Sequence, residues 1–193
     1  YDEDDLGRDK LDVATAKLRK INSDITVTPL PGRIIPSFEI PEEVTAVADC
    51  LLGVLGRVLE TGGKFDGCGL WEDMCFNQGP LLGPAHFKWF LAPHYRRLTD
   101  LLHRHGVDVI WVDCDGKIDE LLPLWLESGV NCMFPIEVGT WGGDPVAFRK
   151  QYGKDLLMMG GFDKNILARG KDAIEAEVHR LAPLVEEGGF IGF

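Results

Sequence analysis

The sequence has 193 residues, 45% of them hydrophobic, which is enough for one globular domain with a sizeable core. Its 31 acidic and 20 basic residues give a formal net charge of -11, which argues against nucleic acid and anionic membrane surfaces as partners. No apolar run approaches the roughly 20 residues of a membrane-spanning helix, and the acidic start YDEDDLGRDK does not resemble a secretory signal. We therefore expect a cytoplasmic protein with no membrane or nucleic-acid partner.

Cysteine usage agrees with that compartment. The five cysteines are Cys50, Cys68, Cys75, Cys114 and Cys132. They include no Cys-x-x-Cys pair, and three of the five lie in or beside apolar runs. This is typical of buried, reduced thiols in a cytoplasmic protein. A zinc site would need cysteine clustered with histidine, and only Cys75 and His86 are close in sequence, so the sequence leaves any metal unknown.

The first 35 residues are predicted to form a short helix–strand appendage. The helix is expected to start near Asp5, with an apolar stripe made of Leu11, Ala14, Leu18 and Ile21. Residues 25–28 alternate like a strand, and a proline-rich run over residues 29–36 then breaks the pattern. We therefore expect a domain boundary there, with the main domain covering residues 36–193.

Two helices are predicted before the more regular part of the chain. The first begins after Pro41, and its expected apolar face consists of Val44, Val47, Leu51, Leu55, Val58 and Leu59. A glycine- and proline-rich loop is expected over residues 77–84. The second helix follows over residues 85–105, where Pro93 should kink or divide it.

Five short apolar runs, each ending in an acidic or glycine-rich turn, occupy residues 67–73, 107–116, 130–137, 155–163 and 188–193. Helices are predicted between the later runs, over about 117–128, 144–152 and 171–186. Buried parallel strands read as continuous apolar runs, and a helical crossover must connect them. The alternation therefore predicts an α/β fold with a parallel sheet and helices packed on one side.

Acidic side chains gather where these strands end. The candidate catalytic residues are Glu72, Asp113, Asp115, Glu137 and Asp163, with Asp73 beside the first of them. Because the carboxyl ends of parallel strands face the same way, we expect these side chains to converge on one pocket. Crowded carboxylates raise one another's pKa or share a cation, and either outcome supports catalysis. The alternative is that each carboxylate caps the helix that follows it.

Candidate substrate-binding residues lie at the same strand ends: Trp71, Trp111, Gly160, Gly161 and Lys164. Indole rings near one pocket would suit a flat hydrophobic ligand, although such rings are more often core or rim residues. The two glycines allow close backbone approach to a ligand or form a tight turn. Lys164 is expected to pair with Glu137 across neighbouring strand ends.

Five segments resemble the uroporphyrinogen decarboxylase (URO-D) superfamily: WEDM (71–74), FLAPHYRRLTDLLHRHGVDVIWVDCDG (90–116), ESGVNCMFPIEV (127–138), RKQYGKDLLMMGGFDKNILARGKDAIEAEV (149–178) and EEGGFIGF (186–193). They are ordered and spaced as in that family, and the match covers about 36–193. The resemblance implies a partial (β/α)8 TIM barrel, in which the five runs correspond to the last five of eight strands.

Residues 1–30 resemble a different family. YDEDDLGRDKLDVATAKLRKINSDITV is similar to the segment that follows the nucleotide-binding loop of ThiF/MoeB-type ubiquitin-activating-like enzymes. That resemblance implies a phosphate contact for Lys10. The glycine-rich loop of that fold is missing, however, which favours reading Lys10 as a solvated helix residue. Two resemblances on one chain favour a fragment or a misjoined reading frame over a two-function enzyme.

The URO-D resemblance implies two chemistries. One is decarboxylation of a tetrapyrrole, uroporphyrinogen, in porphyrin biosynthesis, which needs no cofactor. The other is methyl transfer between a corrinoid and a thiol, for which a divalent metal or a corrinoid would be needed. Against the first, the substrate is highly anionic whereas these strand ends are acidic. Against the second, residues 113–116 read Asp-Cys-Asp-Gly, without the histidine of the family's zinc motif.

The sequence thus predicts a URO-D-like protein that acts on a small-molecule substrate. Whether it is an enzyme stays open, because the superfamily includes carboxy-lyases and methyltransferases and this chain shows neither site in full. The alternatives are a corrinoid-dependent methyltransferase and a catalytically incomplete barrel fragment. Five strands cannot close a barrel, so in the last case we expect a homo-oligomer or a partner chain to cover the open sheet edges.

Overall fold

The computed structural model describes residues 10–21 and 42–193, and the chain divides into two compact units, Tyr1–Phe38 and Glu39–Phe193. In the first unit, α1 (Lys10–Ile21) confirms the predicted helix, and Val13 on it is buried. The predicted start near Asp5 and the predicted strand over residues 25–28 lie outside the described residues.

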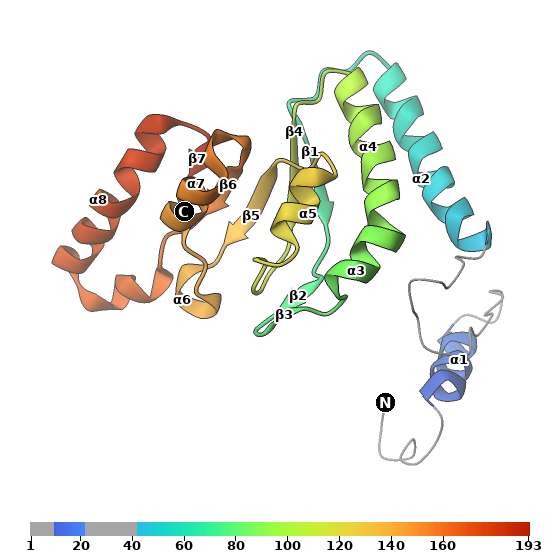
Figure 1. Ribbon diagram of the computed structural model, residues 1–193, viewed down its shortest axis with the longest axis horizontal. Helices are drawn as coiled ribbons and strands as arrows, with labels where there is room; N and C mark the ends of the chain where they lie inside the picture. The colour runs from blue at the N-terminus through green and yellow to red at the C-terminus, as the bar shows by residue number, and fades with distance from the viewer. Residues whose placement is uncertain (1–9, 22–41) are drawn as a thin grey trace. The chain divides into compact units, whose positions relative to one another are not determined.

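The second unit is a mixed α/β fold built on a five-stranded parallel sheet (Figure 1). Its strands are β1 (Gly67–Trp71), β4 (Val109–Asp113), β5 (Cys132–Ile136), β6 (Leu157–Gly160) and β7 (Phe190–Ile191), and they pair in that order. All four pairings are parallel, which confirms the prediction from the alternating pattern. Because the spatial order follows the chain order and parallel crossovers are right-handed, the connecting helices lie on one face of the sheet.

Five longer helices accompany the sheet: α2 (Glu42–Glu60), α4 (Ala92–Arg104), α5 (Leu122–Glu127), α7 (Pro145–Tyr152) and α8 (Lys171–Glu187). The core lies between the sheet and these helices. Alternate strand residues such as Ile110, Val112 and Met133 are fully buried there, together with Trp125 of α5. Within the described ranges, no helix is both long enough and apolar enough to cross a membrane.

The segment between β1 and α4 differs from its prediction. A small antiparallel hairpin, β2 (Cys75–Phe76) with β3 (Gly79–Pro80), begins before the loop expected over residues 77–84 and extends into it. The expected helix is divided into α3 (Pro84–His86), the π-helical turn η2 (Phe87–Leu91) and α4. The division agrees with the expected effect of Pro93, which lacks the N–H that a continuous α-helix would use.

Other helix predictions need correction. The helix expected from residue 117 begins at Leu122, because Pro123 occupies its first turn and Lys117 N–H instead binds the Phe76 carbonyl (3.0 Å). Leu51 and Val58, predicted to face the core from α2, are 67% and 44% exposed. Three short helices were not predicted: α6 (Val138–Trp141), η3 (Gly153–Asp155) and η4 (Lys164–Arg169).

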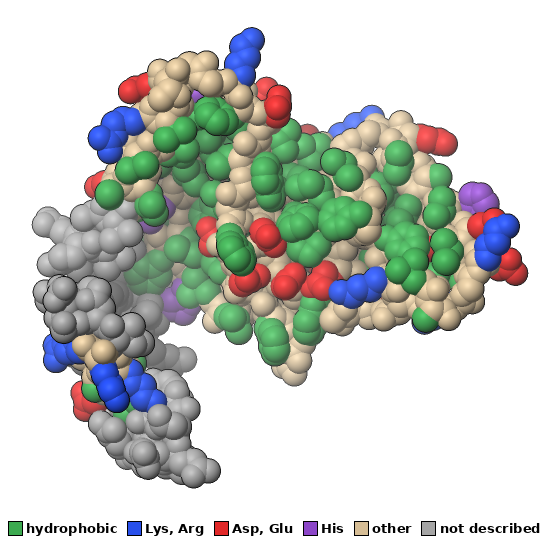
Figure 2. Space-filling view, turned by 180° about the vertical axis from the view of Figure 1, so that it is seen from behind, with side chains coloured by type: hydrophobic (Ala, Val, Ile, Leu, Met, Phe, Trp, Pro, Cys, Tyr) green, Lys and Arg blue, Asp and Glu red, His purple; other side chains and the backbone are tan. Residues whose placement is uncertain are grey.

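The other face of the sheet carries no helix among the described elements. Trp111 and Asp113 point to this face, opposite to buried Ile110 and Val112, and the Trp111 ring covers Gly67 and Gly69 so closely that a Cβ at Gly69 would lie 2.5 Å from it. Figure 2 shows hydrophobic side chains over the centre of this face and a row of acidic side chains along one border. Within the described residues β1 and β7 each pair on one side only, so this sheet is open.

Candidate functional site

A pocket of about 500 Å³ lies where β4, β5 and β6 end. Its lining combines charged residues with an apolar wall, formed by Asp113, Asp115, Glu137, Lys164, Phe134, Phe162, Leu167 and Phe193. Three of the five predicted catalytic residues and two of the predicted substrate-binding residues, Lys164 and Gly160, therefore share one pocket. The parallel sheet explains this convergence, because each of these residues follows or ends a strand at the same edge.

Glu137 is a largely buried carboxylate of the pocket, fixed by a hydrogen bond and an ion pair. Its side chain is only 14% exposed, and Oε2 accepts a hydrogen bond from the Gly116 backbone N–H (3.2 Å). Oε1 lies 3.8 Å from Lys164 Nζ, so the expected pairing of Glu137 with Lys164 is confirmed. Lys164 itself is 71% exposed, which leaves its ammonium group free to contact an anionic group of a ligand as well.

The surroundings of Asp113 favour its protonated form. Desolvation, with smaller contributions from the carboxylates of Asp73 and Asp115, raises the pKa of Asp113 above its usual value. Asp73 and Asp115 are themselves joined, because Asp73 Oδ1 accepts from the Asp115 backbone N–H (3.3 Å). A raised pKa favours retention of a proton, which is the property of a general acid.

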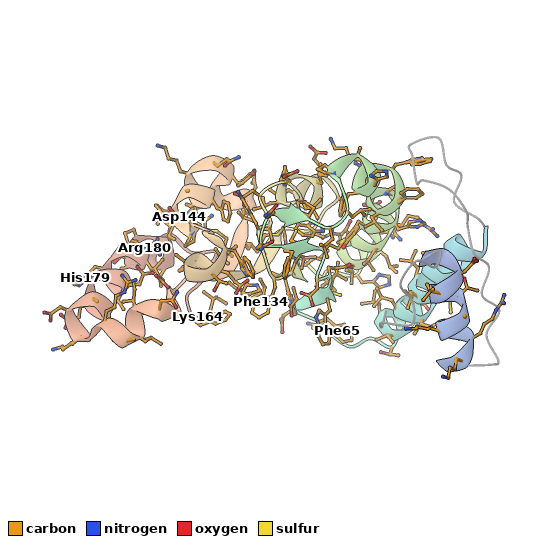
Figure 3. The ribbon with its side chains drawn as sticks, turned by 90° about the horizontal axis from the view of Figure 1, so that it is seen from below. Phe65, Phe134, Asp144, Lys164, His179 and Arg180 are labelled. Atoms are coloured by element: carbon orange, nitrogen blue, oxygen red, sulfur yellow. The ribbon has the colours of Figure 1, made fainter. Side chains whose placement is uncertain are left out.

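The apolar wall comes from aromatic side chains that the sequence pattern did not identify as site residues. Phe134 of β5 and Phe193 lie with ring centroids 5.6 Å apart, and Phe162 lines the same pocket. Figure 3 shows Phe134 toward the middle of the sheet and Lys164 on the side of α8. The signal available in the sequence was the period-2 pattern of β5, which places Phe134 on the same face as Trp111 and Asp113.

Two predicted catalytic residues lie elsewhere. Glu72 lines a separate pocket beside α2 and α4. Asp163 caps η4, its Oδ1 accepting from Asn165 N–H (3.0 Å), as the helix-capping alternative anticipated. The expectation that all five carboxylates converge therefore holds for three of them.

The remaining predicted binding residues have other positions. Trp71 is 85% exposed, and its Nε1 donates to Asp73 Oδ2 (3.2 Å). Trp111 packs on the glycines of β1, and neither indole lines the pocket. Gly161 has φ +85 and packs against Pro145 and Phe190, so it forms the tight turn rather than a ligand contact.

The geometry does not identify a metal ligand set. Among residues 10–21 and 42–193, no group of three or more His, Cys, Asp or Glu side chains could hold a metal ion. Cys114 is buried, and its thiol donates to the Asp115 carbonyl (3.4 Å). The arrangement thus offers carboxylates, a lysine and aromatic surface for an organic ligand.

Comparisons with family models, curated proteins and solved structures returned no match for this chain.

Proposed function

We propose that this chain forms the substrate pocket of a β/α-barrel carboxy-lyase related to uroporphyrinogen decarboxylase, acting on a tetrapyrrole-related small molecule. The observation that carries the proposal is the single pocket in which aromatic side chains, carboxylates and one lysine meet at the carboxyl ends of parallel strands. The sequence resemblance over about 36–193 supplies the reaction class. The five-stranded parallel sheet is consistent with part of such a barrel.

Each group has a role in this proposal. Phe134, Phe162 and Phe193 contact the flat apolar body of the substrate, and Lys164 binds a substrate carboxylate. The bond between the substrate carbon and its carboxylate breaks, carbon dioxide leaves, and the electron pair stays on that carbon. Asp113, whose pKa is raised, then delivers the proton that replaces the lost carboxylate and regains one from water.

The alternative that the chain is catalytically incomplete is favoured by a separate observation. Within the described residues the sheet is open at β1 and β7. Large apolar side chains are exposed at these edges: Trp71 at the end of β1 (85%), Ile191 at the end of β7 (63%) and Phe193 after it (62%). Edges and apolar side chains of this kind invite pairing with another chain. For the methyltransferase alternative no described donor set fits zinc, so we derive no metal-dependent step.

Porphyrin binding tests the pocket. Titration of the chain with uroporphyrin, followed by the Soret absorbance, should show saturable binding that Lys164→Ala weakens about tenfold, because a charge-assisted contact is lost. Lys154→Ala is the matched control, since Lys154 Nζ binds the Glu187 carbonyl (3.0 Å) outside the pocket. Absence of saturable binding, or equal loss in both variants, would contradict the proposed substrate class.

An activity assay distinguishes a catalytically complete carboxy-lyase from a chain that binds the substrate but is catalytically incomplete. Because five strands leave the barrel open, we expect no coproporphyrinogen from uroporphyrinogen with the chain alone. Porphyrin binding without turnover supports an incomplete site. Turnover by the purified chain would show that no partner chain is needed.

A further inference from the structure

A second pocket, of about 380 Å³, lies between α2, β1 and α4 and is independent of the proposed function. Its wall is aliphatic and comes from these three elements and from η2: Ala48, Leu51, Leu52, Leu55, Leu70, Leu91 and Leu98. All of these residues except the exposed Leu51 are only half-buried, so they are packed on one side and open on the other. Three polar residues complete the lining: Glu72, His94 and Tyr95.

Two of these polar residues have buried atoms without hydrogen-bond partners. Tyr95 is 6% exposed, and its Oη makes no hydrogen bond of normal geometry, although the Glu72 carboxylate and Trp125 Nε1 lie close enough to shift its pKa. His94 Nδ1 is likewise buried and without a partner. Buried polar atoms in proteins are nearly always hydrogen-bonded, so these two atoms point to a missing ligand.

Glu72 gives the pocket its charge. Its carboxyl group is at the end of β1, where burial raises its pKa and the neighbouring Tyr95 hydroxyl lowers it. None of the described side chains lining this pocket is lysine or arginine, so the lining itself does not neutralise the carboxylate. A half-buried carboxylate without a cation is destabilised by desolvation, and a cationic ligand would offset that cost.

We propose that this pocket binds an aliphatic primary ammonium ion. The ammonium group has three N–H donors, and the lining offers three acceptor atoms for them: a Glu72 carboxylate oxygen, the Tyr95 hydroxyl oxygen and His94 Nδ1. The hydrocarbon chain lies against the half-exposed leucines and removes their surface from water. The volume is within the range of small-ligand sites. The carboxylate of a fatty acid would be repelled by the Glu72 carboxylate. An alcohol is neutral and would leave the Glu72 charge without a counter-ion.

Octylamine is the probe for calorimetry on the full chain, with octanol and octanoate as matched ligands of equal chain length. We expect saturable one-to-one binding of octylamine, about tenfold or more tighter than octanol, and no binding of octanoate. Glu72→Gln should weaken octylamine about tenfold or more while octanol binding persists, which shows that the pocket is still folded. Glu137→Gln, in the other pocket, should leave octylamine binding unchanged.

Equal affinities for octylamine and octanol, or an unchanged octylamine affinity in Glu72→Gln, would overturn the proposal. If Glu72→Gln does not fold, Tyr95→Phe provides a second test, because it removes only the hydroxyl group. Octylamine should then bind several-fold more weakly, and unchanged affinity in that variant would also overturn the proposal. Neither outcome depends on porphyrin binding at the strand ends.

Discussion

Arg149 on α7 donates from Nη2 to the carbonyl oxygen of Gly188 (3.1 Å), joining this helix to the turn that precedes β7. The same guanidinium also binds the carbonyls of Gly153 (2.6 Å), Leu156 (3.1 Å) and Gly189 (3.2 Å). Its side chain is only 8% exposed. One buried cation therefore satisfies four backbone acceptors at the amino-terminal edge of the sheet, opposite to the pocket of the proposed function.

Replacing Arg149 should strongly destabilise the fold. In Arg149→Met four carbonyls lose a charged donor, and we expect the free energy of unfolding to fall by about 3 kcal/mol or more. Urea denaturation followed by circular dichroism measures this. Lys154→Met is the control, since its exposed ammonium binds one carbonyl in the same region, and we expect a change of roughly 0.5 kcal/mol or less. Similar losses in the two variants would contradict the proposed role of Arg149.

Glu177 should make stability depend on acid pH. It is 5% exposed and accepts from Arg180 Nη2 (2.7 Å), Arg180 Nε (2.8 Å) and Asp163 N–H (3.1 Å), and the bonds from Arg180 are the main cause of its lowered pKa. A folded pKa below the unfolded value stabilises the protein above the unfolded pKa, and this contribution is lost as pH falls through the folded pKa.

The measurement is the free energy of unfolding of the wild type and of Glu177→Gln at a series of pH values. The difference between them should be largest near neutral pH and should shrink in the acid range, because Gln does not titrate. Figure 3 shows Arg180 beside Asp144, whose Oδ1 accepts from Arg180 Nη1 (3.2 Å). Asp144→Asn is therefore the control, because it removes the charge of an exposed partner of the same arginine. A difference that stays constant with pH would exclude the linkage.

Two glycines allow backbone strain to be separated from steric overlap. Gly129 and Gly153 have φ +89 and +62, a region that disfavours other residues. A Cβ at Gly129 would overlap the side chain of Thr99, whose Oγ1 donates to the Ser128 carbonyl (2.8 Å), whereas a Cβ at Gly153 meets nothing within 4 Å.

Gly153 has ψ -147, a combination with positive φ that is essentially restricted to glycine, so we expect Gly153→Ala to cost about 1–3 kcal/mol of stability from backbone strain alone. Gly129→Ala should cost about 1–3 kcal/mol more than its own backbone strain, because the buried Thr99 must also move. Thermal denaturation of both variants gives the comparison. If the two costs are equal, the steric contribution of Thr99 is negligible.

Cysteine modification should follow burial and pKa. Cys50 is exposed, whereas burial raises the pKa of Cys132 to about 12 and leaves almost no thiolate near neutral pH. Cys75 donates toward Cys114, which lowers the pKa of Cys114, but both thiols are buried. With iodoacetamide at about pH 8 and mass spectrometry, we expect rapid labelling of Cys50, and labelling of Cys75, Cys114 and Cys132 only after unfolding in urea. Rapid labelling of Cys132 in the native protein would contradict this.

The parallel sheet was predictable because its strands carry a strong local signal. Apolar runs followed by glycine or acidic turns located all five strands, and the same logic placed Asp113, Asp115 and Glu137 in one pocket. The ion pair between Glu137 and Lys164 also followed from neighbouring strand ends. These features depend on chain direction and spacing, which the sequence contains.

Features that depend on side-chain direction or on contacts between separate turns were not predicted. Glu72 follows β1 as Glu137 follows β5, yet it contributes to a pocket between helices, because the two-residue period of β1 places it with Leu70 on the helix-facing side. The four carbonyls bound by Arg149 lie in separate turns, so no sequence spacing identifies them. The β2–β3 hairpin is too short to give a periodic signal.

Because the strands pair in chain order, local unfolding of the sheet can begin at its last strand, β7. β7 pairs only with β6, through Met158 with Phe190 and Met159 with Ile191, whereas β4 and β5 each have partners on both sides. Transient separation of β7 and α8 would break those contacts and the Arg149 bonds to Gly188 and Gly189 without disturbing any β1–β4 or β4–β5 hydrogen bond. Amide hydrogens should therefore exchange slowest in β4 and β5 and progressively faster toward β7, so that local stability falls toward this edge of the sheet.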